Sequence, residues 1–242
     1  MAVLQGREVV VAVRLINMLS IIIPTLNEEE NIEALLQHVQ STAQTRDYEI
    51  IVVDGGSHDN TLSIAQSHCD DVLTAKSGRG TQLNAGVERS TGDVFLFLHA
   101  DTQLPNHFDA MIFERIAKNP MKGWGFFSIK LSGQRLIFQV IAKLINVRSK
   151  FTSIATGDQC LFVTRNAFHQ INGYKSIPLM EDVDFTKRLK KYGTPIFIKE
   201  SVVTSSRRWE EKGVVRTILL MWWLRLLFFI GVSPEKLSGL YR

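Results

Sequence analysis

The sequence predicts an α/β fold built around a mostly parallel sheet flanked by helices, and three observations support this prediction. Apolar runs of strand length alternate with segments of helical periodicity. The runs are apolar at nearly every position, so both faces of each strand must be covered, which alternating helices achieve in a parallel sheet. The chain has 242 residues, 45% of them hydrophobic, with no internal repeat or linker, which is typical of one compact unit.

The N-terminal half is predicted to alternate strand and helix. The apolar run 19–24 is the first strand, and the segment 27–40 after it carries apolar residues at helical spacing. The following elements are a strand over 48–53, a helix from about 61, a strand over 71–74, a helix through Leu83 and Val87, and a strand over 94–98.

The C-terminal half is predicted to be mixed. Its elements are a helix over 107–117, a strand near 125–131, a helix near 136–147, a strand over 159–163, a helix from about 181 and a strand over 195–203. Met18 stands directly before the first strand, so we expect 1–17 to be a dispensable N-terminal extension. Residues 18–205 then form the α/β domain, and 206–242 form a basic and apolar helical segment packed on the domain or on a membrane surface.

Composition excludes several classes of protein. The net charge of +4 comes without a long Lys/Arg block, which argues against nucleic-acid binding. Cys69 and Cys160 are far apart and have no metal-like spacing, so we expect two buried thiols and a reducing, cytoplasmic compartment. The longest apolar run of the N-terminal segment, 9–13, is too short for the core of a secretion signal.

Polar residues end the predicted strands, where open α/β sheets bind their ligands. Asp54 ends the second strand and Asp101 follows the fourth, so the two carboxylates are predicted to converge on one crevice. For Asp54 a helix cap is an equal alternative, because Ser57 and Asp59 beside it are also good caps.

Four segments together resemble the ordered motifs of family 2 glycosyltransferases. They are SIIIPTLNEEENI, EIIVVDGGSHDNT, GDVFLFLHADT and LMEDVDFTKRLKKYG, and the resemblance spans Leu19 to Ser205. It is greatest to the bacterial branch known as selenodomain-associated glycosyltransferases. The resemblance implies a GT-A fold, which is a Rossmann-like sheet flanked by helices, here followed by C-terminal amphipathic helices. It also implies a nucleotide-diphosphate-sugar donor, a Mg²⁺ or Mn²⁺ cofactor and inversion at the anomeric carbon.

The resemblance assigns the donor site to several loops. Pro24, Thr25, Asn27 and Glu28 match the first nucleotide-contacting loop, although a helix start with an acidic first turn is the alternative. Asp54 matches the first of two consecutive aspartates. The second is replaced by Gly55, which leaves the choice of nucleobase open.

The metal motif of the family, Asp-X-Asp, reads His99, Ala100, Asp101 in this chain. The resemblance makes Asp101 the metal ligand, which hard cations permit because phosphate sites commonly supply only one or two protein carboxylates. His99 is a second ligand, a hydrogen-bond donor to the ribose, or a structural histidine. Ala100 lies between them at the donor.

A glycine-flanked arginine lies in KSGRGTQLNAG, residues 76–86. A helix is predicted to begin just after Arg79, and its backbone amides with one guanidinium suit a diphosphate. The family more often has arginine where Leu83 stands, so Arg79 is predicted to act from the loop, with Gln82 and Asn84 as polar neighbours. A simple glycine turn is the alternative.

Acidic residues mark the predicted acceptor side. In MEDVDF the resemblance makes Asp182 the general base, and it places Glu181, Gly157 and Asp158 near the sugar or acceptor; an acidic helix N-terminus is the alternative for Glu181. Family relatives often bring a basic residue from the C-terminal region to the diphosphate. Arg207 and Arg208 match that position, with a solvated basic patch as an equal alternative.

The C-terminal run 217–232 is dense in Leu, Ile, Trp and Phe but contains Arg225 and is shorter than the ~20 residues of a spanning helix. With basic residues just before it, and with a similar basic, apolar helix near 136–147, it favours a helix lying in the membrane interface. The alternatives are a homodimer contact and a core helix. We therefore expect a cytoplasmic protein associated with the inner face of the cell membrane.

The leading hypothesis is sugar transfer from a nucleotide-diphosphate sugar to a hydroxyl acceptor. The acceptor is unidentified, and a lipid-linked hydroxyl is one candidate. The first alternative, a sugar-nucleotide nucleotidyltransferase, would favour a glycine-rich basic loop after the first strand, where this chain has PTLNEEE. The second alternative is an inactive nucleotide-sugar-binding protein, suggested by the acids missing at Gly55 and His99. The presence of Asp101 and Asp182 argues against it.

Overall fold

The computed structural model describes residues 17–241, except for the side chains of Arg208 and Lys212. The predicted extension 1–17 therefore lies almost wholly outside the described residues. The strands are β1 Leu19–Thr25, β2 Tyr48–Asp54, β3 Asp71–Thr74, β4 Val94–Phe97, β5 Thr102–Gln103, β6 Trp124–Leu131, β7 Phe162–Thr164 and β8 Ile196–Thr204. The helices are α1 Ile32–Thr42, α2 Thr61–Gln66, α3 Arg79–Arg89, α4 Phe108–Ala117, α5 Leu136–Thr152, α6 Arg165–Gln170, α7 Glu181–Tyr192, α8 Arg207–Lys212, α9 Val214–Phe229 and α10 Pro234–Tyr241, with a 3₁₀ turn, η1, at Gly157–Gln159.

One sheet organises the described chain, with strand order β3-β2-β1-β4-β7-β6-β8-β5. The strands β3, β2, β1 and β4 run parallel, and β6 is parallel to β8. The antiparallel strand β7 joins these two parallel groups. The mostly parallel α/β fold is thus confirmed, and the carboxyl ends of β1, β2 and β4 meet at one edge.

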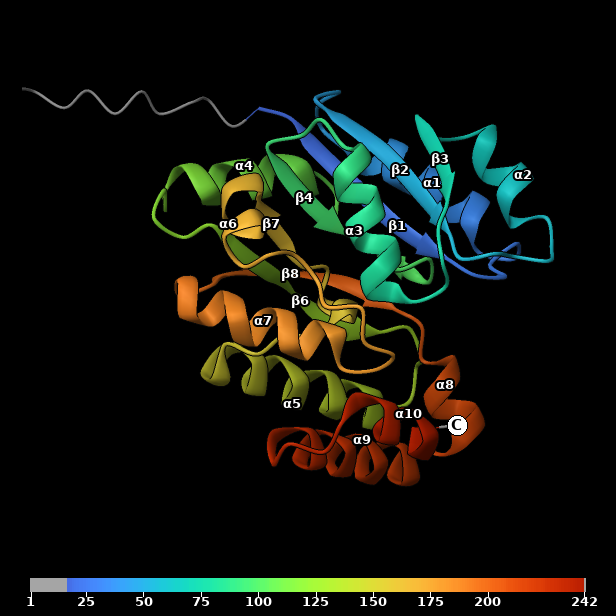
Figure 1. The fold of residues 1–242 in the computed structure, drawn as a ribbon, viewed down its shortest axis with the longest axis vertical. Coiled ribbons are helices and arrows are strands. Elements are labelled where there is room, and N and C mark those ends of the chain that lie inside the picture. Colours follow the sequence, from blue (N-terminus) through green and yellow to red (C-terminus); the bar gives the residue numbers. More distant parts are fainter. Residues whose placement is uncertain (1–16, 242) are drawn as a thin grey trace, which may run out of the picture.

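Both faces of the sheet are buried, which explains why the strands are apolar at successive positions. On β1, Ile21 and Ile23 face one core with Leu36 of α1 and Ile112 of α4. Ile22 faces the other core with helices α3, α6 and α7. Figure 1 shows α3 in front of the sheet and α7 and α5 below it.

The C-terminal helices pack at the bottom of the view in Figure 1, with α9 below α5. Leu224 of α9 and Leu237 of α10 are fully buried against Met180 and Val183, which lie at the beginning of α7. The predicted helix near 217–232 is thus observed as α9. It contacts the domain at the start of α7, whose first turn is acidic. No helix within residues 17–241 combines the length and apolarity needed to cross a membrane.

Several boundaries differ from the predictions. Helix α1 begins at Ile32, because residues 27–31 form a loop bonded to the loop after β2. Gln159 ends the η1 turn, which shortens the predicted strand 159–163 at its start. Helix α3 begins at Arg79 itself. Of the two free thiols, Cys160 is buried but Cys69 is only half-buried.

Candidate functional site

Two adjoining pockets open at the carboxyl edge of the parallel strands. The first pocket has a volume of about 340 Å³ and lies between the β1 loop, the start of α3 and the turn after β4. Its lining residues are Pro24, Thr25, Leu26, Glu28, Ser77, Gly78, Arg79, Gln82, His99, Ala100 and Asp101. The structure brings together here seven of the ten residues predicted for the donor and the predicted metal ligand Asp101. The seven are Pro24, Thr25, Glu28, Arg79, Gln82, His99 and Ala100.

The second pocket has a volume of about 170 Å³ and shares Arg79, His99 and Asp101 with the first. It extends from these residues to the C-terminal helices. Its acidic side chains are Asp158, Glu181 and Asp182, and its far wall includes Thr217, Met221 and Arg225 of α9 and Tyr241 of α10. The predicted donor side and the predicted acceptor side are thus neighbours.

Four carboxylates converge on Arg79. Partial desolvation opposes the charge of its guanidinium, whose side chain is 59% exposed, but the charges of Glu181, Asp158, Asp182 and Asp101 outweigh this and raise the pKa of Arg79. The closest pair is Arg79 Nη1 with the Glu181 carboxylate, at 3.8 Å. The acids therefore surround one fixed positive charge at the junction of the two pockets.

The acids at the start of α7 hold protons more tightly than ordinary carboxyls. Burial raises the pKa of Glu181, and the neighbouring charge of Asp182 raises it further. Burial also raises the pKa of Asp182, with a contribution from Asp158, against the hydrogen bond donated by the Gly157 amide. That bond, 2.9 Å long, links η1 to Asp182. Raised pKa values of this kind suit general acid–base chemistry.

His99 is bound to the η1 turn. Its Nδ1 lies 3.2 Å from Asp158 Oδ1. A Cβ added to Gly157 would lie 2.5 Å from His99 Nε2, so the ring approaches this backbone as only glycine permits. Both ring nitrogens thus face η1, and the geometry does not support His99 as a metal ligand. Asp101 is exposed, and its Oδ1 accepts a hydrogen bond from the Thr102 hydroxyl at 3.3 Å.

The predicted donor contact of Asp54 finds no support in the lining of the first pocket. Its side chain is 2% exposed and lies outside the first pocket. Oδ2 accepts hydrogen bonds from the amides of Gly56 and Ser57, both at 2.8 Å, and Oδ1 accepts from the hydroxyls of Ser57 and Thr25. These four bonds use the acceptor capacity of the carboxylate, so Asp54 stabilises the loop after β2.

Two asparagines predicted at the donor also serve the scaffold. Asn27 accepts from the His58 amide at 2.9 Å and tethers the β1 loop to the β2 loop. Asn84 exchanges two hydrogen bonds with the backbone of Tyr174, at 2.8 and 2.9 Å. The side-chain oxygen of Asn27 and the side-chain amide of Asn84 thus have backbone partners, and donor contact by either residue stays a prediction.

Gln82 explains why glycine follows Asp54. Its carboxamide donates to the carbonyls of Thr25 and Val53, at 2.9 and 2.8 Å, and ties the ends of β1 and β2 together. A Cβ at Gly55 would lie 3.1 Å from the Gln82 Nε2. The side chain of Gln82 thus fills the space that a second aspartate would enter.

Of the two C-terminal arginines predicted to bind, only Arg207 has a described side chain, and it does not line the first pocket. Arg207 is exposed and pairs with Glu211 of its own helix at 4.0 Å, so the predicted closure over the donor is not seen for it. The side chain of Arg208 lies outside the described residues. Trp209, which the sequence analysis did not select, lines the second pocket instead.

Other lining residues were also missed. Ser77 and Gly78 stand within the segment that singled out Arg79, so their position was a usable signal. Arg225 was noticed only as a charge that interrupts an apolar run. Leu26 and Leu179 carry no distinguishing signal in the sequence.

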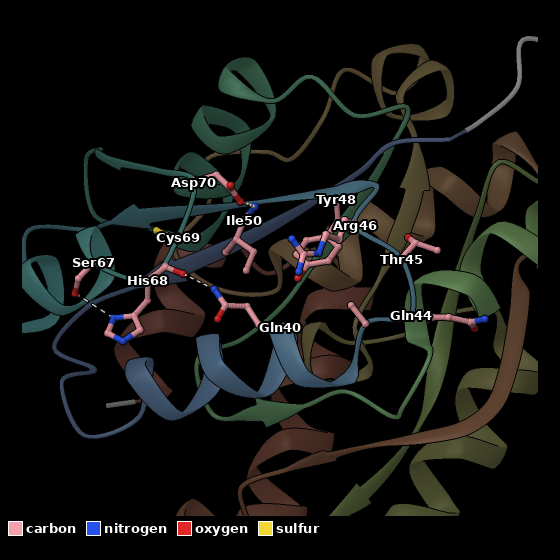
Figure 2. Close-up of a pocket in the computed structure, with 11 residues that line it drawn as sticks. Gln40, Gln44, Thr45, Arg46, Tyr48, Ile50, Ser67, His68, Cys69 and Asp70 are labelled. Atoms are coloured by element: carbon pink, nitrogen blue, oxygen red, sulfur yellow. Dashed lines mark hydrogen bonds between the residues drawn. The ribbon is translucent and has the colours of Figure 1, made fainter.

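A larger hollow of about 690 Å³ lies elsewhere, between the ends of α1 and α2 and the beginning of β2. Figure 2 shows its polar side chains, with Ser67 bonded to the ring of His68 and Gln40 bonded to the His68 carbonyl. Burial raises the pKa of Cys69 to about 11, so its thiol stays protonated and unreactive at neutral pH. This hollow is distant from the carboxyl ends of the strands and carries no comparable cluster of acids.

Comparison with known proteins matches residues 20–165 to the family described as glycosyl transferase family 2. A dolichol-phosphate mannosyltransferase from Pyrococcus furiosus is 35% identical over 103 residues, which cover 40% of this chain and 29% of that protein. An undecaprenyl-phosphate 4-deoxy-4-formamido-L-arabinose transferase from Pseudomonas paraeruginosa is 30% identical over 113 residues, which cover 43% of this chain and 33% of that protein. The matches thus span about a third of the length of these relatives.

Solved structures share the fold. A mannosyltransferase from Pyrobaculum calidifontis, in complex with GDP-Man and Mn²⁺, superposes with a TM-score of 0.65 at 19% identity, covering 92% of this chain and 67% of that one. S. aureus TarS in complex with UDP superposes with a TM-score of 0.64 at 18% identity, covering 78% of this chain and 60% of that one. At these identities the likeness concerns the arrangement of helices and strands.

Proposed function

The chain belongs to glycosyl transferase family 2 and has the GT-A fold, and we propose that it transfers a sugar from a nucleotide-diphosphate sugar to an acceptor hydroxyl. The observation that carries this proposal is the wall of Arg79, His99 and Asp101 shared by the two pockets. A donor in the first pocket would present its sugar to an acceptor in the second. The bacterial selenodomain-associated branch remains a prediction.

The first pocket suits a nucleoside diphosphate. Gly78 precedes α3, Arg79 stands in its first turn, and both residues line this pocket. Such a helix start favours phosphate oxygens. Glu28, on the opposite wall, would contact the ribose or the base. The bound GDP-Man and UDP of the similar solved structures support this assignment.

A divalent cation, Mg²⁺ or Mn²⁺, is part of the proposal. No group of three or more His, Cys, Asp or Glu side chains suited to a metal occurs within residues 17–241. The exposed carboxylate of Asp101 fits a cation that takes its other ligands from the donor diphosphate and from water. When bound, the cation would neutralise negative charge on the diphosphate. The Mn²⁺ in the solved mannosyltransferase supports this.

The chemistry proposed for the second pocket is a displacement with inversion. Asp182 would accept the proton of the acceptor hydroxyl, and the hydroxyl oxygen would form a bond to the anomeric carbon. The bond from that carbon to the diphosphate oxygen breaks, and the nucleoside diphosphate leaves with the electron pair. Arg79 would stabilise the charge that develops on this leaving group.

A lipid-linked acceptor is proposed from the surface around the second pocket. Helices α5 and α9, which both line that pocket, expose the apolar side chains Leu136, Val140, Leu144, Val147, Phe151, Val215, Leu219, Trp222, Trp223, Leu226 and Phe229. The names of the relatives from Pyrococcus furiosus and Pseudomonas paraeruginosa both refer to lipid phosphates. Peripheral binding to the inner face of the cell membrane would bring such an acceptor to the pocket.

The donor proposal is tested by thermal unfolding with nucleotide diphosphates and nucleotide sugars, with and without Mn²⁺. A ligand at 100 times its Kd stabilises a protein by about 2.7 kcal/mol, which corresponds to roughly 5–10 °C in Tm. Asp101→Ala should remove the metal-dependent part of the shift. Asp47→Ala, an exposed aspartate before β2, is the control and should retain it. The proposal fails if no nucleotide diphosphate raises the Tm under any metal condition.

A further inference from the structure

Arg225 is a charged residue on the otherwise apolar helix α9, and it faces inward. Thr217, Met221 and Arg225 follow one another at i, i+4 and i+8 and all line the second pocket. The exposed apolar residues of α9 lie on the opposite face, for example Leu219 and Leu226. Arg225 is thus turned towards the pocket, away from the solvent-exposed face of its helix.

One nitrogen of this guanidinium has no hydrogen-bond acceptor. The Nε of Arg225 is buried and makes no hydrogen bond. The acids that line the same pocket are those around Arg79, where Glu181 pairs with Arg79. A guanidinium nitrogen that is taken out of water without an acceptor costs free energy. The fold tolerates this cost at the wall of a pocket, where a ligand can supply the acceptor.

The chemistry around Arg225 points to an amphiphilic anion. A guanidinium offers a planar fork of N–H donors that matches a phosphate group. Its neighbours on the pocket wall include the apolar side chains of Ile129, Leu131, Ile145 and Met221. A volume of about 170 Å³ holds a phosphate and the beginning of a chain, and the exposed stripes of α5 and α9 are available to the rest.

We propose that Arg225 binds a phosphate group of the acceptor, so that the acceptor is a phosphate-bearing amphiphile anchored between α9 and the acidic helix α7. This inference rests on the proposed function, since it names the substrate class of the second pocket. The phosphate serves as an anchor. The reacting group is a hydroxyl beside Asp182, because the carboxylates around Arg79 would repel a phosphate at that end of the pocket.

The test uses geranyl phosphate, geraniol and inorganic phosphate as probes of the full chain, without donor or metal, with binding followed by calorimetry. Geranyl phosphate should bind more tightly than either of the other probes. Arg225→Met should weaken geranyl phosphate binding roughly tenfold or more, as expected for a lost charged hydrogen bond. Arg225→Lys should retain part of the affinity. Lys236→Met, which removes an exposed charge on α10, should leave it unchanged.

Equal affinity of Arg225→Met and Lys236→Met for geranyl phosphate would overturn the proposal, and so would equal affinity of the wild-type chain for inorganic phosphate and geranyl phosphate. Arg225→Lys keeps the charge and supplies a second variant if the methionine variant does not fold. The nucleotide-dependent Tm shift is measured on the same variants. Its retention in Arg225→Met separates a failure of this anchor from a failure of the donor site.

Discussion

At the scale of single residues, the two strand-end aspartates have separate tasks. Asp101 faces both pockets, whereas the carboxylate of Asp54 accepts three hydrogen bonds from its own loop and one from Thr25 at the end of β1. A side chain with no remaining acceptor capacity cannot bind a ligand without breaking the loop that it holds. The geometry of the first pocket therefore depends on Asp54 indirectly, through the position of the loop.

Asp54→Asn should lower stability and leave donor affinity nearly unchanged. The asparagine oxygen can still accept from the amides of Gly56 and Ser57, but its NH2 group cannot accept from the hydroxyls of Ser57 and Thr25. A cost of about 2 kcal/mol is expected, or roughly 4–8 °C in Tm. Asp71→Asn is the control, because it removes only an exposed ion pair with Arg89 and should cost less than about 1 kcal/mol. A large loss of nucleotide binding at unchanged Tm would restore Asp54 as a donor contact.

The pH dependence of transfer should report the environment of Asp182. Burial and the charge of Asp158 raise the pKa of this carboxyl, and the base acts only when deprotonated. Activity should therefore fall with decreasing pH at values above the ordinary aspartate pKa of about 3.9. Asp158→Asn removes one of the two causes, so the acid limb of kcat should move to lower pH.

The control for this measurement is again Asp71→Asn, whose acid limb should match that of the unaltered chain. An acid limb that stays in place or moves to higher pH in Asp158→Asn would contradict the assignment. The same raised pKa affects folding. The protonated form of Asp182 is favoured in the folded state, so its contribution to stability is present below the unfolded pKa and is lost as pH rises through the folded pKa.

At the scale of elements, the position of α3 depends on a glycine. Gly86 faces β1 and β2, and a Cβ there would lie 2.4 Å from Ile22 Cγ2 and 3.1 Å from Val53 Cγ2. The helix therefore lies close against the strands whose ends form the first pocket. A shift of α3 would also move Arg79, which begins the same helix.

Gly86→Ala should destabilise the fold although alanine favours helices. Overpacking costs about 1–3 kcal/mol, against about 1 kcal/mol gained in helix propensity. Gly239→Ala is the matched control on α10, where a Cβ would meet no atom within 4 Å, and it should stabilise. Chemical denaturation compares the two variants, and equal stabilisation of both would refute the close packing of α3.

At the scale of the whole molecule, the apolar faces of α5 and α9 distinguish one end of the protein. Trp222 is 66% exposed and Trp223 is 54% exposed. Exposed apolar surface of this extent commonly marks an interaction site. Because both helices also line the second pocket, a membrane at this end would lie beside the proposed acceptor site.

The protein should co-sediment at low salt with vesicles that contain anionic lipids, and this binding should weaken as ionic strength rises. The double substitution Trp222→Ser with Trp223→Ser should reduce binding several-fold. Met121→Ser changes an apolar residue that is 87% exposed on the loop before β6 and should have no effect. Absence of vesicle binding, with concentration-dependent dimerisation instead, would assign this face to a homodimer.

The sequence by itself determined the order of strands and helices and the edge of the sheet that carries the site. Both follow from local periodicity and from the polar residues that end each apolar run, which led to the prediction that Asp54 and Asp101 converge on one crevice. Asp182 and Asp158 were added through the family motifs. Their meeting at Arg79 agrees with that assignment.

Only the tertiary structure decided which polar groups face the pockets. Asp54 and Asn84 are occupied by backbone partners whose positions depend on loop conformation, and Asn84 meets a partner 90 residues away. Arg225 lines the same pocket as the start of α7 because α9 packs Leu224 against Met180 and Val183. Such contacts arise from the packing of segments distant in the chain, and periodicity, which records only which side of each segment is apolar, does not encode them.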